Sequence, residues 1–361
     1  MKSQTAPPPF ALQYSSQIPE LLHRLNSSLA LSTFQAGKLI FLSPKDENTL
    51  IQLPRNFQKP MGFSFDESYS RLALACKEEI IVFRSSAELA AHYPKSPATY
   101  DTLYMPRATY HSGGLDVHDL HFGKENKLYG VNTLFSCISL FDDNYNFTPV
   151  WSPPQITELA SEDRCHLNGM ALQDGLPKYA TAFNQGNTVQ SWRENITSSG
   201  VIFDVESSEV IAQGLAMPHS PKIYNNQLYV LQSAKGEVSR VDVYTGRVEV
   251  VAKIGGFVRG MTLIGDYLFV ARSKLRKNSS TFAHLNIPES ENNAGIFVLH
   301  LPSGSLAGQI IYQSSVDEIY DLHALKGCIR PNILNTISAD YKNGLSTPNA
   351  TYWAQTQENH E

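Results

Sequence analysis

Apolar and polar positions alternate along this chain in short runs, and the runs are separated by turns rich in Gly, Asn, Asp and Pro. Such alternation predicts β-strands, and the turn signals between them predict antiparallel hairpins. The regularity is clearest between 218 and 253, where turns at Asn225-Asn226, Lys235-Gly236 and Thr245-Gly246 separate four apolar runs. The pattern therefore predicts an all-β protein.

One local pattern recurs about six times. A polar or charged turn leads at once into an apolar strand and then into a second strand. The starts lie roughly 40–60 residues apart, which is the spacing of propeller blades. The repeat therefore predicts a six-bladed β-propeller. The copies are KPMGFSF from Lys59, DVHDLHF from Asp116, CHLNGMAL from Cys165, MPHSPKIY from Met217, FVRGMTLI from Phe257 and DEIYDLHAL from Asp317.

The two ends of the repeat predict how the ring closes. The last copy breaks off near Cys328, whereas the apolar runs at 29–53 have no inner strand of their own. Closed propellers often complete the final blade with a strand from the other terminus. We therefore expect residues 29–53 to pair with residues 316–326. The predicted organisation is a leader and short helix (1–28), a single propeller domain (29–335) and a polar C-terminal tail (336–361).

Shorter segments carry their own signals. Residues 16–26 have one apolar stripe at helical spacing, and Ser16 is placed to cap a short helix there. A second helical insert is expected at 87–93. The Pro-rich residues 1–15 predict a mobile leader, and the polar residues after 335 predict a surface tail or disorder. The polar insertion at 274–293 either is a loop or contains a further strand pair.

Composition narrows the class of protein. The chain has 361 residues, a net charge of −5 and 17% charged residues, and it has no long basic run, which argues against nucleic-acid binding. No apolar stretch approaches 18 residues and no secretory signal is evident, so we expect a cytoplasmic protein without a membrane span. Four scattered cysteines predict buried free thiols in a reducing compartment. They are Cys76, Cys137, Cys165 and Cys328.

The candidate chemistry comes from the turns. The innermost strand of each blade lines the central channel, so residues at the strand starts converge on one mouth. His118, His166 and His219 hold matching places in three consecutive copies. Three imidazoles with an open position suit zinc or iron and a metal-bound water, with Asp119 and Asp163 orienting the second ring nitrogens. Without a metal, the same histidines either act as bases, bind a substrate or bond to a neighbouring blade's backbone.

Charged side chains join the histidines at this mouth. Arg259 either holds a carboxylate or phosphate of a ligand or pairs with Glu318 or Asp321 of the next blade. On a regular strand Glu318 and Asp321 point to opposite faces, and we expect Glu318 to be the one in the channel. Lys38 either reaches the same mouth from the closing blade or stays solvated. Ser136 lacks the G-x-S-x-G elbow, which argues against a serine hydrolase.

A distant resemblance concerns the third copy. HLNGMALQDG from His166, followed by KYATAF from Lys178, resembles the turn of six-bladed propellers of the SMP-30/gluconolactonase/strictosidine-synthase type. The resemblance implies that Asn168 is a ligand of a divalent metal in the axial channel. The chain departs from that pattern in the next copy, where His219-Ser220-Pro221 stands in place of an aspartate before Gly. Met61-Gly62 also occupies the place of the N-terminal glutamate ligand.

A closer resemblance covers most of the chain. The sequence is similar to a family of bacterial conserved hypothetical proteins that is described as a domain of unknown function and predicted to form propellers. The resemblance implies a propeller fold and a bacterial cytoplasmic setting, and it brings no reaction. It is carried by STFQAGKLIFL from Ser32, VNTLFSC from Val131, DRCHLNGMAL from Asp163, MPHSPK from Met217, GFVRGM from Gly256 and EIYD from Glu318.

Three functions follow from these residues. The first is a metal-dependent enzyme, hydrolase- or lactonase-like, that acts on a small anionic substrate. The second is a binding module that takes up a small molecule or peptide at the mouth and partners another enzyme. The third is a scaffold that uses its outer rim. The residues expected to carry the chemistry are His118, Asp119, His166, Arg259 and Glu318 as catalytic residues, Asn168, Ser220, Arg259 and Lys38 as substrate-binding residues, and His118, His166 and His219 as metal ligands.

Overall fold

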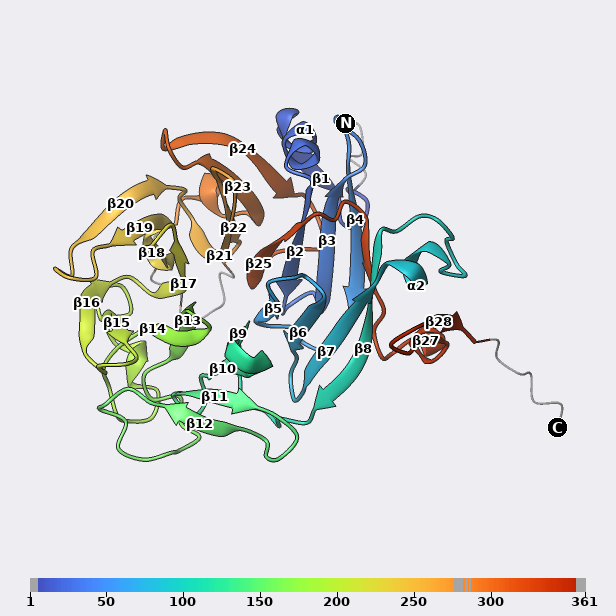
Figure 1. Cartoon of the computed structure of the whole chain (residues 1–361). Coiled ribbons are helices and arrows are strands. Elements are labelled where there is room, and N and C mark those ends of the chain that lie inside the picture. Colours follow the sequence, from blue (N-terminus) through green and yellow to red (C-terminus); the bar gives the residue numbers. More distant parts are fainter. Residues whose placement is uncertain (1–5, 276–281, 283–284, 286, 355–361) are drawn as a thin grey trace.

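The protein is a six-bladed β-propeller. The computed structural model describes residues 6–275, 282, 285 and 287–354. Its strands form six sheets of four or five strands each, together with one separate hairpin. Figure 1 shows the six sheets arranged in a ring around a central axis. The sequence prediction of an all-β, six-bladed fold is confirmed.

Each blade is an antiparallel sheet of four consecutive strands from the axis outward, except that the sixth blade combines strands from both ends of the chain. Blade 1 consists of β5 (Phe63–Phe65), β6 (Arg71–Ala75), β7 (Ile80–Ser86) and β8 (Thr102–Tyr110). Blade 2 consists of β9 (Val117–Phe122), β10 (Leu128–Asn132), β11 (Cys137–Phe141) and β12 (Thr148–Trp151). Blade 3 consists of β13 (Leu167–Gln173), β14 (Leu176–Ala182), β15 (Gly200–Asp204) and β16 (Val210–Leu215). Blade 4 consists of β17 (Pro218–Tyr224), β18 (Gln227–Gln232), β19 (Glu237–Val241) and β20 (Val248–Lys253). Blade 5 consists of β21 (Phe257–Ile264), β22 (Tyr267–Ser273), β23 (Gly295–His300) and β24 (Ser305–Tyr312). Blade 6 consists of β25 (Asp321–Lys326), β2 (Ser27–Thr33), β3 (Lys38–Pro44) and β4 (Leu50–Asn56).

The ring closes between the two ends of the chain, as the sequence predicts. β25 is the inner strand of blade 6 and pairs antiparallel with β2, with Asp321 opposite Ser32. Figure 1 shows the C-terminal strand beside the N-terminal ones. This pairing completes blade 6 as a four-stranded sheet in the order β25, β2, β3 and β4.

The N-terminal segment is more ordered than the sequence indicates. Helix α1 (Gln17–Arg24) forms where a helix is expected, and it buries Ile18 and Leu22 against the core of blades 5 and 6. Ser16 precedes the helix but makes no side-chain capping bond. Strand β1 (Leu12–Tyr14) adds a fifth strand to blade 5 by pairing with β24. The prediction of a mobile leader through residue 15 is therefore wrong for this strand.

The C-terminal segment also contains regular structure. β26 (Pro331–Ile333) pairs parallel with β8 as a fifth strand of blade 1, and β27 (Gly344–Ser346) and β28 (Thr351–Trp353) form a hairpin. The indole of Trp353 donates a hydrogen bond to the Leu89 carbonyl oxygen at 3.0 Å. This contact anchors the hairpin on α2 (Ala87–Ala91), where a helical insert is expected. Of the two predicted alternatives, disorder is therefore wrong for residues 344–353, which form a mostly exposed hairpin.

Short 3-10 turns connect several strands. The strand pair considered for 274–293 falls largely on 276–281, 283–284 and 286, which lie outside the described residues. The 3-10 turns are η1 (Lys124–Asn126), η2 (Ser191–Arg193), η3 (Ser233–Lys235), η4 (Glu289–Glu291) and η5 (Ala339–Lys342).

The hydrophobic core lies between neighbouring blades. Phe41 of blade 6 and Phe63, Phe83 and Tyr104 of blade 1 are fully buried in one such layer. Burying a side chain of this size contributes roughly 1.5–3 kcal/mol. All four cysteines are free and buried, as the sequence predicts. Among the described residues, no helix is long and apolar enough to cross a membrane.

Candidate functional site

The inner strands of four blades carry β-bulges near the axis. The pairing register between β9 and β10 shifts at Val131/Asn132, which leaves His118 without an opposite residue. The β13–β14 pairing skips Asn168 in the same way. Comparable shifts occur on β17 after His219 and on β21 around Arg259. A bulge re-aims a side chain without ending the strand, so side chains that strict alternation would separate can reach the axis together.

These bulges border a deep axial cavity. Its volume is about 970 Å³. Its wall includes His118, His166, His219, Arg259 and Glu318, so the structure brings together five of the residues that the sequence selects. The rest of the wall combines aromatic rings with polar and charged side chains, among them Lys274, Glu289 and Asp317. Its rings include Phe34, Phe183, Trp192, Phe257 and Tyr320.

The three histidines line one cavity together with aromatic rings. The rings of His118 and His166 meet edge to face, with centroids 4.9 Å apart. The Phe183 ring contacts both His166 and His219, and its centroid lies 4.5 Å from that of His166 and 5.1 Å from that of His219. Within the part of the chain that the structure describes, no three His, Cys, Asp or Glu side chains are arranged to hold a metal ion. Zinc or iron bound by all three histidines stays a prediction.

His166 belongs to a hydrogen-bonded triad of side chains. Its Nδ1 lies 3.0 Å from Asp163 Oδ2. The same carboxylate oxygen accepts a hydrogen bond from the Trp192 indole at 2.8 Å. Because the indole fixes the carboxylate and the carboxylate fixes the imidazole, His166 is held in one orientation with its Nε2 directed away from Asp163. A histidine oriented by a carboxylate is the usual arrangement of a general base.

His118 and His219 are uncharged at neutral pH. Burial lowers the pKa of His118 to about 4, although the nearby Asp116 opposes the shift. Burial also lowers the pKa of His219 well below its ordinary value, and the charge of Arg259 adds to this effect. Burial penalises the charged form of an imidazole. The two side chains therefore act as neutral hydrogen-bonding groups at pH 7.

Arg259 and Lys274 are the cations in the described wall, and Lys274 lies 3.6 Å from Asp317. The Arg259 guanidinium stacks on the Tyr320 ring, with Cζ 3.4 Å from the ring centroid. Across the described residues, no carboxylate forms an ion pair with Arg259, and the predicted alternative of a pair with Glu318 or Asp321 is not formed. Glu318 instead accepts the backbone N–H of Gln35 at 3.1 Å. A guanidinium held by a ring keeps its donors available to an anion.

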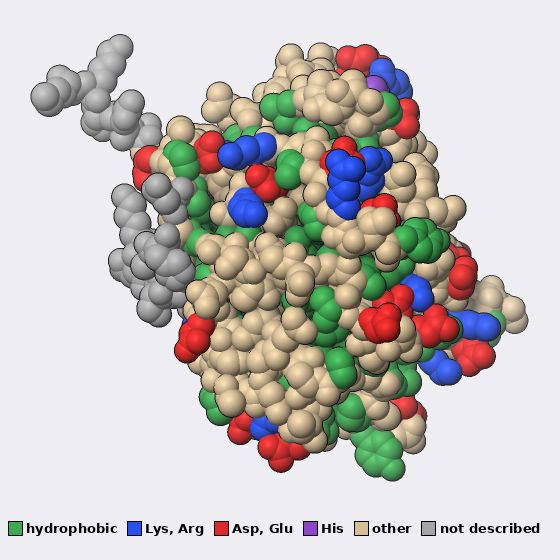
Figure 2. All heavy atoms as spheres, turned by 90° about the vertical axis from the view of Figure 1, so that its left-hand side faces the viewer, with side chains coloured by type: hydrophobic (Ala, Val, Ile, Leu, Met, Phe, Trp, Pro, Cys, Tyr) green, Lys and Arg blue, Asp and Glu red, His purple; other side chains and the backbone are tan. Residues whose placement is uncertain are grey.

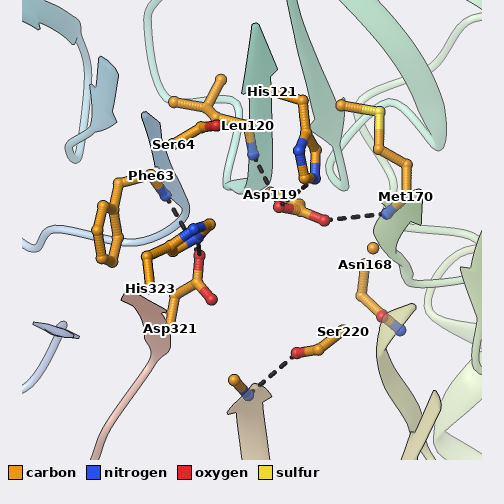
Figure 3. Close-up of polar contacts among 12 residues, drawn as sticks. Phe63, Ser64, Asp119, Leu120, His121, Asn168, Met170, Ser220, Asp321 and His323 are labelled. Atoms are coloured by element: carbon orange, nitrogen blue, oxygen red, sulfur yellow. Dashed lines mark hydrogen bonds and ion pairs between the residues drawn. The ribbon is translucent and has the colours of Figure 1, made fainter. Parts of the chain in front are cut away.

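Asp119 and Asp321 join neighbouring blades, as Figure 3 shows. Asp119 accepts the N–H of Leu120 and, across the blade boundary, the N–H of Met170, both at 3.0 Å. Asp321 likewise accepts the N–H of Leu322 at 2.8 Å and that of Phe63 in blade 1 at 3.4 Å. Each carboxylate thus holds the inner strand of the next blade. Asp119 does not orient a cavity histidine.

Each of these carboxylates also contacts a histidine two positions later. His121 Nε2 lies 3.2 Å from Asp119, and His323 Nε2 lies 3.0 Å from Asp321. Burial alone would raise the pKa of Asp119, but His121, Lys222 and the Met170 N–H outweigh it and hold that pKa below its ordinary value. The sequence contains the signal for this pair, because D-L-H occurs in both copies.

A small polar space of about 10 Å³ lies next to the cavity, and Asn168, Ser220 and Asp321 line it. Asp321 therefore lines this smaller space, whereas Glu318 lines the large cavity. β25 begins at Asp321, so strand alternation does not apply between these two residues. Asn168 accepts the hydroxyl of Thr181 at 2.9 Å.

The remaining predicted contacts lie outside the cavity. The Ser220 hydroxyl accepts the N–H of Gly260 at 3.0 Å and so links blades 4 and 5. Lys38 begins β3, and its ammonium contacts the Asn56 side chain. Neither residue is part of the wall of the large cavity. The sequence did not indicate Phe183, Trp192 and Tyr320 as cavity residues, because a single aromatic residue in a β protein cannot be distinguished by pattern from a residue of the hydrophobic core.

A second hollow lies on the outer edge of blades 3 and 4. Figure 2 views this side of the molecule, and acidic and basic side chains are interspersed across it. The groove has a volume of about 1080 Å³, and two of its three cations form ion pairs. Lys178 pairs with Asp204 at 2.9 Å, and Arg240 pairs with Glu249 at 2.6 Å. The axial cavity is the better candidate site, since its arginine lies in one wall with three histidines and several aromatic rings.

Comparisons with known proteins bear on the family and the fold. The nidogen/laminin complex contains a chain of similar structure, with a TM-score of 0.51, 12% identity, and coverage of 83% of this chain and 99% of that chain. At this identity the likeness shows the fold alone. No curated protein matches the chain. Residues 16–334 match the family described as a domain of unknown function (DUF4915). Because that match spans most of the sequence, the protein belongs to this family of propellers.

Proposed function

We propose that the axial cavity binds a small organic anion. The observation that carries this proposal is Arg259, a guanidinium that stacks on Tyr320 in a cavity with several aromatic rings and that has no carboxylate partner among the described residues. Cavities of this size that combine apolar walls with a few convergent polar groups are typical binding sites for small molecules. The fork of donors on arginine matches a carboxylate or phosphate.

The two ends of the site have separate roles. Arg259 supplies the charge, while the rings of Phe183, Trp192 and Phe257 supply apolar contacts for the rest of the ligand. Hydrogen bonds between ionised groups contribute about 1.5–3 kcal/mol each. Losing the guanidinium should therefore weaken binding by at least tenfold, because 1.4 kcal/mol corresponds to a factor of ten.

A thermal-shift screen of small carboxylic acids and phosphate esters tests the proposal. A bound acid should raise the melting temperature of the parent protein, since ligands stabilise the state that binds them. The same acid at the same concentration should raise the melting temperature of an Arg259→Ala variant much less, because at least tenfold weaker binding stabilises the folded state less. Arg240→Ala is the matched control, because Arg240 lies on the outer edge and pairs with Glu249. An equal shift in Arg259→Ala, or no shift with any acid, would contradict anion binding in the cavity.

His166 supports a second candidate function, which is catalysis on the bound anion. The Asp163–His166 pair could remove a proton from a water molecule for hydrolysis, or from the ligand for isomerisation. General-base catalysis contributes typically 10²–10⁴-fold. Because no metal arrangement is found among the described residues, this proposal uses the imidazole alone.

Turnover on a panel of lactones, esters and hydroxy acids tests this second function. His166→Gln should lower kcat at least 100-fold while leaving the dissociation constant of a product acid within threefold. Asp163→Asn should lower kcat less, because it disturbs only the orientation of the ring. Equal turnover in His166→Gln, or no turnover by the parent protein, would leave the cavity as a binding site without catalysis.

A further inference from the structure

The imidazoles of His118 and His219 face the cavity as hydrogen-bond acceptors. His118 Nδ1 lies 2.9 Å from the Asp116 carbonyl oxygen, and His219 Nδ1 lies 3.1 Å from that of Met217. A carbonyl oxygen only accepts, so we assign the ring proton to Nδ1 in both residues. Each Nε2 then carries a lone pair. No hydrogen bond to either Nε2 comes from the residues that the structure describes.

These acceptors belong to the same wall as the cation. The His118 ring is 5.6 Å from the Tyr320 ring, on which Arg259 stacks. Both His118 and Arg259 also line the small space beside the cavity. A ligand held by Arg259 is therefore presented with lone pairs as well as with guanidinium N–H groups.

An anion that has no hydrogen-bond donor matches Arg259 but does not match the two imidazoles. Its oxygens would bond to Arg259 but would meet the Nε2 lone pairs of His118 and His219, which stay unprotonated at neutral pH. A buried acceptor left without a donor costs about 1–3 kcal/mol. A ligand with a hydroxyl or amino group beside its acidic group would satisfy both kinds of partner.

We propose that the ligand is an organic acid with an adjacent hydroxyl or amino donor and an apolar body, that is, a hydroxy acid or an amino acid. The proposal rests on the proposed anion binding and adds the class of ligand to it. Arg259 holds the acidic group. A hydroxyl donates its single hydrogen bond to one of the two neutral imidazoles, whereas an ammonium group has enough N–H donors for both. The aromatic wall at Phe183 and Phe257 packs against the apolar body.

Three probes with one carbon skeleton test this class. Phenyllactate carries a hydroxyl group, phenylalanine carries an ammonium group and 3-phenylpropionate carries neither. Isothermal titration at pH 7.5 should show that phenyllactate or phenylalanine binds at least tenfold more tightly than 3-phenylpropionate. Tighter binding of phenyllactate would identify a hydroxy acid, and tighter binding of phenylalanine would identify an amino acid.

Variants then assign the preference to the imidazoles. His118→Phe should reduce the preference for the donor-bearing acid to less than threefold, and His111→Phe on the surface should leave it unchanged. If His118→Phe does not fold, the comparison of the three probes on the parent protein still decides the proposal. Equal, Arg259-dependent affinity for all three probes would overturn the donor requirement and leave anion binding intact. Binding of none of them would overturn the proposed ligand class, while the acid screen with Arg259→Ala decides anion binding separately.

Discussion

Replacing Asp119 with asparagine should destabilise the propeller by about 3 kcal/mol. The carboxylate is buried and accepts two backbone N–H groups at 3.0 Å, one of them from Met170 in the next blade. Asparagine has almost the same shape but offers only one oxygen. One hydrogen bond to a charged group becomes neutral, which costs about 1 kcal/mol, and one buried N–H faces an NH₂ group, which costs about 1–3 kcal/mol.

Urea unfolding followed by tryptophan fluorescence measures this loss. The midpoint should fall while the slope stays constant, because the amount of surface exposed on unfolding does not change. Asp242→Asn is the matched control. Asp242 also accepts two backbone N–H groups, those of Tyr244 and Thr245, but it does so in an exposed turn. Its substitution should change stability by less than about 0.5 kcal/mol. A loss under about 1 kcal/mol in Asp119→Asn, or an equal loss in Asp242→Asn, would refute the role of Asp119 as a link between blades.

The pH dependence gives an independent check on Asp119. Its pKa in the folded protein is lower than in the unfolded chain, where an aspartate titrates near about 3.9. Such a group contributes stability above the unfolded pKa and loses it as the pH falls toward the folded pKa. The stability difference between the parent protein and Asp119→Asn should therefore be constant from pH 5 to 7 and shrink below about pH 4.

Three further predictions concern burial and close packing. The pKa of His118 is lowered to about 4 in the folded protein, so its contribution to stability is present above about pH 6.5 and is lost as the pH falls toward 4. His118→Phe should therefore make the free energy of unfolding depend less on pH between about 6.5 and 4. An unchanged pH dependence would contradict the burial of His118 as a neutral group. Gly62→Ala should destabilise by more than about 2 kcal/mol in urea unfolding, because a Cβ would lie 2.6 Å from the Asp119 Cα, whereas Gly114→Ala meets nothing within 4 Å and should be neutral. Burial raises the pKa of the Cys165 thiol to about 12, so this thiol should resist a disulfide reagent in the native protein and react only on unfolding; rapid labelling of the native state would contradict this.

The sequence predicts most of the fold because the signals for it are local and repeated. Each blade consists of neighbouring apolar runs, and the incomplete copy after Asp317 indicates the closure by β2. The errors lie where long-range pairing decides the structure. Leu12–Tyr14 and Pro331–Ile333 are strands because β24 and β8 offer them free edges, and no periodicity in such short segments predicts this.

The candidate site was predictable only in outline. His118, His166, His219, Arg259 and Glu318 all reach the cavity, because turn residues at matching places in a repeat converge on the axis. The roles of individual side chains depend on bulges, which pattern analysis does not detect. For this reason the sequence did not predict that Asp119 links two blades or that aromatic rings line the cavity.

A crystal structure of the protein with phenyllactate would show whether Arg259 and the imidazoles bind the same acid. We expect electron density for the acid in the axial cavity, with its carboxylate on Arg259 and its hydroxyl within 3.2 Å of His118 or His219 Nε2. Density with the carboxylate on Arg259 but the hydroxyl directed away from both imidazoles would contradict the ligand class alone. Density on the outer groove of blades 3 and 4, or an empty cavity in crystals at saturating phenyllactate, would contradict the assignment of the cavity as the site that binds this acid.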